Sequence, residues 1–186
     1  MKIIVAITGA SGAIYARRTL EQLLASEQVE RIALIMSDTA KRVVPHEGVE
    51  LPTSERIEIY DNHEMFSSVA SGSASWDAMI VVPASMGSVG RMAAGVSQTL
   101  IERAADVMLK ERRRLVIVVR ETPYSLIHLR NMTTLTEAGA IILPASPSFY
   151  SNPATIEEAV DTVVERIMAH AGVEAPHYEF SGCEGK

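Results

Sequence analysis

Cysteine is nearly absent from this sequence, since only Cys183 occurs among its 186 residues. That count excludes an internal disulfide framework and any multi-cysteine metal site, and it favours a reducing, cytoplasmic setting. The histidines also lack metal-ligand spacing from one another: His46, His63, His128, His170 and His177. We therefore predict that the protein holds no metal ion.

Long apolar runs and an excess of positive charge are missing too. No run approaches the ~20 apolar residues that a membrane-spanning helix needs. The apolar stretch at 2–7 stops at a glycine-rich turn and leads into a charged helical pattern, which is not typical of a signal peptide. A formal net charge of −6 argues against nucleic acid as the main partner. We expect neither a membrane nor a nucleic-acid partner.

Short β-branched runs alternate along the chain with helical patterns. The predicted strands are 3–7, 32–36, 79–82, 115–119 and 140–143, and the predicted helices are 12–25, 38–45, 87–94, 99–111, 124–138 and 156–171. This alternation predicts an α/β fold, a doubly wound parallel sheet in three layers like that of Rossmann or flavodoxin domains. The length fits one domain, which we place at 1–175, followed by a polar tail at 176–186. Residues 46–76 are the least regular part.

Residues that typically begin and end helices support these boundaries. Thr122 and Pro123 have the pattern of an N-cap followed by proline at the first helical position, and Gly139 follows the end of the same helix. Thr155 lies three residues before a glutamate, which is the spacing of a capping box, and Gly172 follows the last turn.

The first predicted strand ends in TGASGA, residues 8–13, which opens directly into a helix. Gly9 permits a tight turn and a close backbone approach, Ser11 offers a hydroxyl, and the helix start offers unpaired N–H groups to an anion. The motif lacks the full GxGxxG spacing, so a monophosphate is favoured over a pyrophosphate cofactor. A tight turn without a ligand remains the competing interpretation.

Two further loops follow predicted strands at the same edge of the sheet. In the first loop, Ser37 would contact the ligand if it is a flavin, and Asp38 would bind the ribose if it is a dinucleotide. The simplest interpretation of Asp38, however, is a helix N-cap. The second, residues 83–88, combines serines and glycine in a pattern suited to a phosphate or a ring. Three such loops at one edge are stronger evidence for a ligand site than any one alone.

Within the basic segment at 102–128, the predicted apolar strand is followed directly by Arg120 and Glu121. Arginine can bind an oxyanion bidentately, so Arg120, with Arg103 and Lys110 nearby in sequence, suggests a phosphate clamp. Glu121 cannot neutralise that anion, and it would orient an arginine or handle protons. Arginines 112–114 are better explained as a solvated basic face.

Three other residues stay ambiguous from their patterns alone. Glu47 is a single loop carboxylate, which is more often a surface residue than a catalytic one. Tyr150 follows the last predicted strand and would either reach the ligand edge or pack its own loop. Arg166 lies on the flank of the apolar stripe of the last helix, where arginine is usually solvated.

Taken together, these segments resemble the UbiX-like flavin prenyltransferases, within the wider family of flavin-binding cysteine decarboxylases. The resemblance rests on TGASGAIY, the MS pair at 36–37, Glu47, ASGS at 70–73, the loop at 83–88, ERAADVMLKERR, VRETPYSLIHLRNM and LPASPSFYSNP. It implies a flavodoxin-like subunit that binds FMN and needs no metal. It also implies assembly into trimers, often dodecamers, with active sites at subunit interfaces.

The resemblance further implies a reaction. Such enzymes join a dimethylallyl group from dimethylallyl monophosphate to N5 and C6 of reduced FMN, and the prenylated FMN then serves a UbiD-type decarboxylase. Two alternatives share the fold. One is FMN-dependent oxidative decarboxylation of a carboxy-terminal cysteine, and the other is a non-catalytic FMN-binding subunit of a decarboxylase.

Site residues follow from the same resemblance. The positions that match FMN contacts are Gly9, Ala10, Ser11, Ser37, Ser85, Met86, Gly87, Ser88 and Arg120. Those that match the surroundings of the prenyl phosphate are Lys110, Arg120, Glu121, Tyr150 and Arg166. Arg103 matches another active-site arginine, and Glu47 matches the acidic residue near the flavin. The catalytic set implied is Glu121, Glu47, Lys110 and Arg120.

The sequence departs from its relatives at three places. Ala84 stands where many relatives have cysteine, so thiol chemistry is excluded there. Met65 occupies roughly the place of a tryptophan, with Phe66 beside it as a substitute. The end of the chain has Tyr178 and Phe180 where a tryptophan is usual. These changes bear on how an allylic cation is shielded and on which prenyl donor is preferred.

Overall fold

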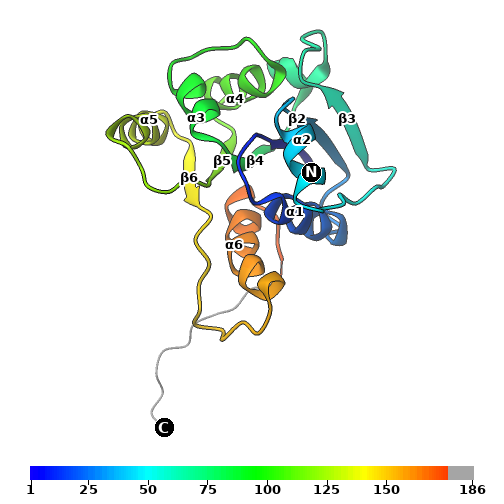
Figure 1. Ribbon diagram of the computed structural model, residues 1–186. Coiled ribbons are helices and arrows are strands. Elements are labelled where there is room, and N and C mark those ends of the chain that lie inside the picture. Colours follow the sequence, from blue (N-terminus) through cyan, green and yellow to red (C-terminus); the bar gives the residue numbers. More distant parts are fainter. Residues whose placement is uncertain (176–186) are drawn as a thin grey trace.

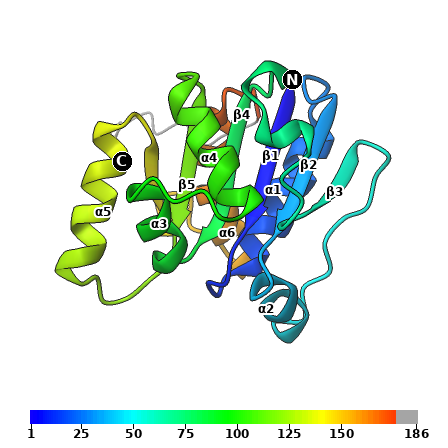
Figure 2. The ribbon, with the colours of Figure 1, turned by 90° about the horizontal axis from the view of Figure 1, so that it is seen from above.

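A computed structural model describes residues 1–175 and contains a six-stranded sheet in which all paired strands are parallel. The strands are β1 (Lys2–Ile7), β2 (Arg31–Met36), β3 (Ile57–Asp61), β4 (Ala78–Ala84), β5 (Arg114–Val119) and β6 (Ile141–Pro144). Their order is β3-β2-β1-β4-β5-β6 (Figure 2). This is the doubly wound order of Rossmann folds, and it confirms the predicted fold class.

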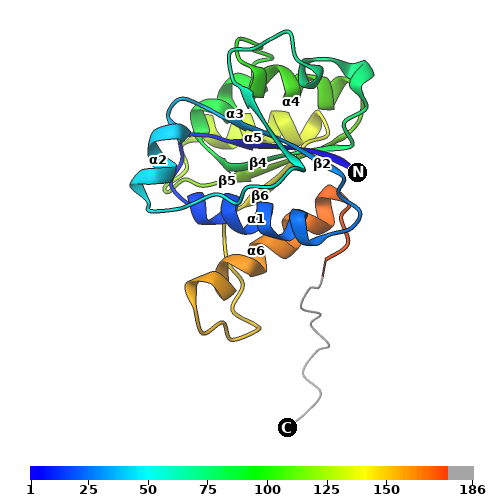
Figure 3. The ribbon, with the colours of Figure 1, turned by 90° about the vertical axis from the view of Figure 1, so that its right-hand side faces the viewer.

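Helices cover both faces of the sheet. They are α1 (Ala13–Ala25), α2 (Ala40–His46), α3 (Met86–Ala93), α4 (Leu100–Lys110), α5 (Leu126–Glu137) and α6 (Ile156–Ala171), with short 3-10 turns at Ser68–Ala70 and Gly72–Ala74. Alternate strand residues feed two separate apolar clusters, because neighbouring side chains of a strand point to opposite faces. Helices α1 and α6 pack on one face, and α3, α4 and α5 lie over the other (Figure 3).

Strand β3 lies in the segment that the sequence left irregular, so that prediction was incomplete. It pairs with β2 alone, at the edge of the sheet. Its sequence IEIYD alternates polar and apolar residues and is only partly buried, with Ile59 69% exposed. A strand covered so incompletely lacks the continuous apolar run by which the buried strands were recognised.

Two local boundaries also differ from the expectation. Helix α5 is capped by Ser125, whose Oγ accepts the N–H of His128 at 3.2 Å, so Thr122 is not its N-cap. The Thr122–Pro123 peptide is cis and belongs to the loop before the helix. Pro83 and Ala84 lie within β4, beside an irregularity in its pairing with β5. Thr155 and Gly172 cap α6 as predicted.

Strands β1 and β4 are neighbours, yet their following helices cover opposite faces, so the sheet reverses its winding between them. Thr8 joins the two strand ends: its Oγ1 donates to the Pro83 carbonyl at 2.9 Å and accepts the Ser85 N–H at 2.7 Å. Ligands of open α/β sheets bind at this reversal, outside the carboxyl ends of the strands.

The chain between β6 and α6 leaves the sheet as an extended arm, residues 145–155, before α6 returns to pack on α1 (Figure 1). Phe149 and Tyr150 lie on this arm and are 69% and 72% exposed. Across residues 1–175, no helix combines the length and apolar character that crossing a membrane requires.

Candidate functional site

The first turn of α1 is closed by a carboxylate from a distant loop. Glu47 accepts the backbone N–H of Gly12 at 3.0 and 3.1 Å and that of Ala13 at 2.7 Å. Gly12, at the N-cap, has φ +108° and no side chain with which to cap the helix. The expectation that this helix start offers unpaired N–H groups to an anion is therefore wrong for Gly12 and Ala13, because Glu47 already accepts both.

The environment of Glu47 keeps it ionised. Burial alone would raise the pKa of its carboxyl group. Hydrogen bonds from the Ser11 side chain and from the Ala13 and Gly12 amides, with the positive charge of Arg120, outweigh burial and hold the pKa below its usual range. A fixed negative charge at a helix N-terminus is the stabilising arrangement for the helix dipole.

The first turn of α3, by contrast, is open. Ser85 is its N-cap residue, but the Ser85 side chain does not cap a backbone N–H of the helix. Its Oγ instead lies 3.1 Å from Oγ of Ser88. Within the described residues, no side chain accepts the N–H groups of Met86, Gly87 or Ser88, and a helix has no internal acceptors for them. These donors and the two hydroxyls form a site suited to a phosphate.

Arg120 connects the two helix starts. Its Nε donates to the carbonyl of Ser11 at 3.1 Å, and its backbone N–H donates to the carbonyl of Ala84 at 3.3 Å. The guanidinium therefore lies at the reversal point, between the loops after β1 and β4. Glu121 follows it, half-buried, and its Oε1 accepts the N–H of Thr122 at 3.0 Å.

The loop after β2 packs closely on the loop after β1. The Oγ of Ser37 accepts the N–H of Ala40 at 3.1 Å, whereas Asp38 makes an ion pair with Lys41 and a hydrogen bond with His63. Asp38 is therefore not the N-cap of α2: Thr39 holds that position, and Ser37 binds the first amide of the helix. A Cβ built on Gly9 would lie 2.5 Å from Cγ2 of Thr39, so only glycine fits there.

The arm after β6 brings a second basic residue toward the carboxyl ends of the strands. Ser148, on the arm, donates its N–H to Oγ1 of Thr162 at 2.9 Å. Arg166 lies one turn further along α6, exposed, with its Nη2 3.4 Å from Nε2 of His170. These residues line a hollow together with Pro144 at the end of β6. An exposed Arg166 agrees with its flanking position on the helix.

Two of the predicted residues lie apart from this group within one chain. Lys110 is the last residue of α4 and is ion-paired with Glu111, just before β5 begins. Arg120 follows the other end of β5, a strand of six residues. At 3.3 Å per residue the two ends are separated by about 20 Å. Arg103 lies on α4 and donates to the carbonyl of Ala70 at 3.2 Å. Nearness in sequence therefore does not bring Lys110 to Arg120 within one chain, and the side-chain contacts of Arg103 are with Ala70 and Asp106.

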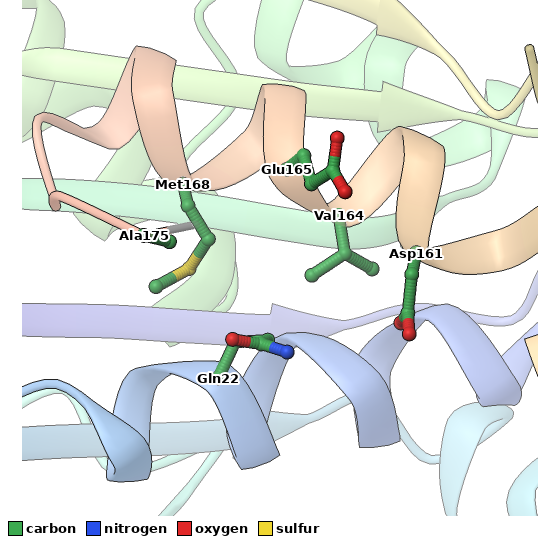
Figure 4. A pocket seen from close by; sticks show the side chains of 6 residues that line it. All are labelled: Gln22, Asp161, Val164, Glu165, Met168 and Ala175. Atoms are coloured by element: carbon green, nitrogen blue, oxygen red, sulfur yellow. The ribbon is translucent and has the colours of Figure 1, made fainter. Parts of the chain in front are cut away.

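Another pocket lies between α1 and α6 and differs in chemistry. Its lining residues are Gln22, Asp161, Val164, Glu165, Met168 and Ala175 (Figure 4). Two carboxylates and no cation make it unsuited to a phosphate ester. Within residues 1–175, no three His, Cys, Asp or Glu side chains gather in a way that could hold a metal ion.

Three residues that organise the site were not predicted from the sequence. Thr8 links β1 to β4, and its position before the glycine was the available signal. Glu102 is only 2% exposed and binds Arg91, which in turn donates to Ser88. Glu102 follows Thr99 at capping-box spacing, but no sequence pattern indicates its contact with Arg91.

The chain is similar to a known protein family over nearly its whole length. The model of the Flavoprotein family matches residues 1–170. The flavin prenyltransferase UbiX of Methanocaldococcus jannaschii is 42% identical over 177 residues, covering 94% of this chain and 95% of the relative. That of Thermoplasma acidophilum is 44% identical over 176 residues, covering 93% and 96%. The chain belongs to the UbiX family of flavin prenyltransferases.

Solved UbiX-type structures are similar to this chain in both fold and sequence. AnUbiX (PadA1), in complex with FMN and dimethylallyl pyrophosphate, superposes with a TM-score of 0.90 at 40% identity, covering 97% of each chain. A dodecameric FMN-dependent UbiX-like decarboxylase from Escherichia coli O157:H7 also gives 0.90, at 38% identity, covering 98% of this chain and 100% of that one. A PPC decarboxylase mutant, at 14% identity and TM-score 0.65, shares the fold alone.

The donor chemistry at the reversal point fits FMN, the flavin in the UbiX-type complex. A phosphate ester needs several converging donors and no competing carboxylate. The open start of α3 offers backbone N–H groups with Ser85 and Ser88, and Arg120 adds a cation nearby. Residues 9–11, on the loop after β1, have only small side chains beside this phosphate position.

Proposed function

We propose that the protein is a flavin prenyltransferase that transfers a dimethylallyl group from dimethylallyl monophosphate to N5 and C6 of reduced FMN. The observation that carries the proposal is the open first turn of α3 beside Arg120 and Glu121, at the point where the sheet reverses. Relatives at about 40% identity over nearly the whole chain carry the same activity in their names. Bound FMN supplies the nucleophilic ring positions.

Residues of the chain itself would stabilise the leaving phosphate, take up the proton and position the loop beside the flavin. Breaking the allylic C–O bond leaves negative charge on the phosphate, and a preorganised guanidinium at Arg120 stabilises that charge. Glu121 accepts or holds the proton released when the new ring closes. Glu47 is held by the backbone N–H groups of Gly12 and Ala13. It therefore fixes the loop beside the flavin.

A second proposal concerns assembly. Arg103 and Lys110 match active-site positions of the family, but Lys110 lies at the opposite end of β5 from Arg120 and the side chain of Arg103 binds Ala70 and Asp106. We infer that a neighbouring copy supplies them, in a trimer-based assembly that is often dodecameric. Exposed apolar side chains on α5, among them Leu126 and Ile127 at 60% and 69%, offer surface for such contacts. The product, prenylated FMN, would pass to a UbiD-type decarboxylase.

The deciding experiment is to incubate the protein anaerobically with reduced FMN and a prenyl donor, and then to weigh the extracted flavin. Parallel reactions use dimethylallyl monophosphate and dimethylallyl pyrophosphate, since a UbiX-type complex holds the latter. A gain of one C5 unit supports the proposal and identifies the donor. Unchanged FMN that stays tightly bound supports a non-catalytic flavin-binding subunit instead.

The Glu121→Gln variant tests the proton step. It keeps the size of the side chain and should retain FMN while slowing prenylation by roughly 100-fold or more, which is the usual contribution of a positioned acid or base. Normal turnover in this variant would remove Glu121 from the mechanism.

Mixing two inactive variants tests the shared site. Lys110→Ala and Arg120→Ala should each be inactive, yet subunits dissociated and reassembled together should regain activity, because some interfaces then combine two intact halves. Each variant reassembled alone is the control. No recovery in mixed assemblies of confirmed composition would show that both residues act within one chain.

A further inference from the structure

Glu102 is a buried carboxylate whose two oxygens have different partners. It lies on α4 and is 2% exposed. Its Oε2 accepts the N–H groups of Gln98 and Thr99 at 2.9 and 3.1 Å, which caps the start of α4. Its Oε1 accepts Nε of Arg91, on α3. Capping therefore uses one oxygen, and the other is available to hold Arg91.

Arg91 links Glu102 to the open first turn of α3. Its Nη2 donates to Oγ of Ser88 at 3.2 Å, and its Nη1 would lie 3.4 Å from a Cβ built on Gly87. Arginine has only donors, so Oγ of Ser88 must be the acceptor in this bond. The hydrogen of Ser88 is then directed elsewhere, and Oγ of Ser85 lies 3.1 Å away.

This geometry opposes the usual behaviour of a serine in a helix. Such a hydroxyl commonly turns back to the carbonyl four residues earlier. For Ser88 that carbonyl belongs to Ala84, which already accepts the N–H of Arg120. Arg91 instead holds Ser88 toward Ser85, and a hydrogen bond from Ser88 leaves the Ser85 hydroxyl free to donate outward from the loop.

We propose that Glu102 and Arg91 are positioning residues, which orient the hydroxyl of Ser88 toward Ser85 and so leave the hydroxyl of Ser85 as a donor to the phosphate of FMN. The inference rests on the proposed flavin function and deepens it. Arg91 acts here through Ser88 and not by its own contact with the phosphate. The pair therefore determines preference for FMN over riboflavin, which has the same ring system and no phosphate.

The test compares the affinities of oxidised FMN and riboflavin, measured by flavin fluorescence on the full-length protein. Arg91→Gln should weaken FMN binding roughly tenfold, the size expected for one hydrogen bond to a charged group, and leave riboflavin binding unchanged. Arg31→Gln is the matched control. Arg31 is also ion-paired and similarly exposed, 44% against 48% for Arg91, but lies at the start of β2. It should change neither affinity.

A double-mutant cycle with Ser88→Ala separates an indirect role from a direct one. If Arg91 acts through Ser88, adding Arg91→Gln to Ser88→Ala should weaken FMN binding little further. Additive losses would mean that Arg91 contacts the phosphate itself, and they would overturn the inference. Equal losses for FMN and riboflavin would show a merely structural role and overturn it as well.

Glu102→Gln provides a second variant in case Arg91→Gln does not fold. Its amide oxygen can still accept the N–H groups at the start of α4, but its hold on Arg91 is weaker. It should show the same selective loss of FMN binding, and an unchanged ratio of the two affinities would contradict the inference. A wild-type protein that binds neither flavin would instead refute the proposed function itself.

Discussion

Two helices begin at the same edge of the sheet, after the neighbouring strands β1 and β4. Their first turns differ in whether a side chain accepts their backbone N–H groups. The start of α1 is closed by Glu47, whereas the start of α3 has no acceptor among the described residues. Both loops are rich in serine, alanine and glycine, so composition does not distinguish them. Only the three-dimensional contacts show which helix start is left for a ligand.

The difference assigns separate roles to the two loops. A second anion beside α1 would meet the carboxylate of Glu47, whose lowered pKa favours its charged form. The start of α3 carries hydroxyls and no carboxylate of its own. We therefore expect the phosphate of FMN at α3, and the loop after β1 to define the wall beside the ring.

Changing a glycine in each loop should give the largest contrast in stability. Gly9→Ala places a Cβ 2.5 Å from Cγ2 and 2.7 Å from Cβ of Thr39, so the backbone must move. We expect a loss of about 2–3 kcal/mol in the free energy of unfolding, as for other overpacked sites. Gly87→Ala meets only the flexible end of Arg91, at 3.4 Å, and should change stability by less than about 1 kcal/mol.

Denaturant unfolding of both variants measures this contrast. Adding Thr39→Gly to Gly9→Ala removes both clashing atoms and should recover part of the lost stability. Equal losses at the two glycines would contradict the idea that only the loop after β1 is tightly packed.

Removing the charge of Glu47 should have the next largest effect. Glu47→Gln loses charge-assisted hydrogen bonds to the first turn of α1, for which we expect a cost of about 1–2 kcal/mol at neutral pH. The folded-state pKa of Glu47 is lowered, so its stabilising contribution is present above the pKa of the unfolded chain. That contribution disappears as the pH falls through the folded-state pKa.

The measurement is the stability difference between wild type and Glu47→Gln from pH 7 down to pH 3. The difference should shrink toward acid. Glu50→Gln removes the same charge from a nearby exposed position and should show no such dependence. A difference that stays constant with pH would show that Glu47 does not act through its ionised form.

The sequence predicted the buried framework well because buried parallel strands are continuous apolar runs. It also predicted that loops 8–13 and 83–88 meet, since the carboxyl ends of parallel strands share one edge. It could not show that Glu47 reaches Gly12, because the contact spans 35 residues and follows from no local pattern. The separation of Lys110 from Arg120 follows from the direction of α4, which ends where β5 begins.

Helix α5 extends the comparison to a third helix start, and it should give the smallest effect. Its first turn is closed by its own residues: Oγ of Ser125 accepts the N–H of His128, and Nδ1 of His128 accepts the N–H of Ser125. Ser125→Ala should therefore cost about 1 kcal/mol, the usual value of an N-cap. Thr155→Ala is the matched control, since Thr155 caps α6 by the same bond at 3.1 Å.

Thermal unfolding and the affinity for FMN should both be measured on these two cap variants. A helix start closed by its own side chain has no role in holding an anion, so neither variant should alter the preference for FMN over riboflavin. If Ser125→Ala reduced that preference while Thr155→Ala did not, α5 would take part in phosphate binding. The distinction between one open and two closed helix starts would then have to be abandoned.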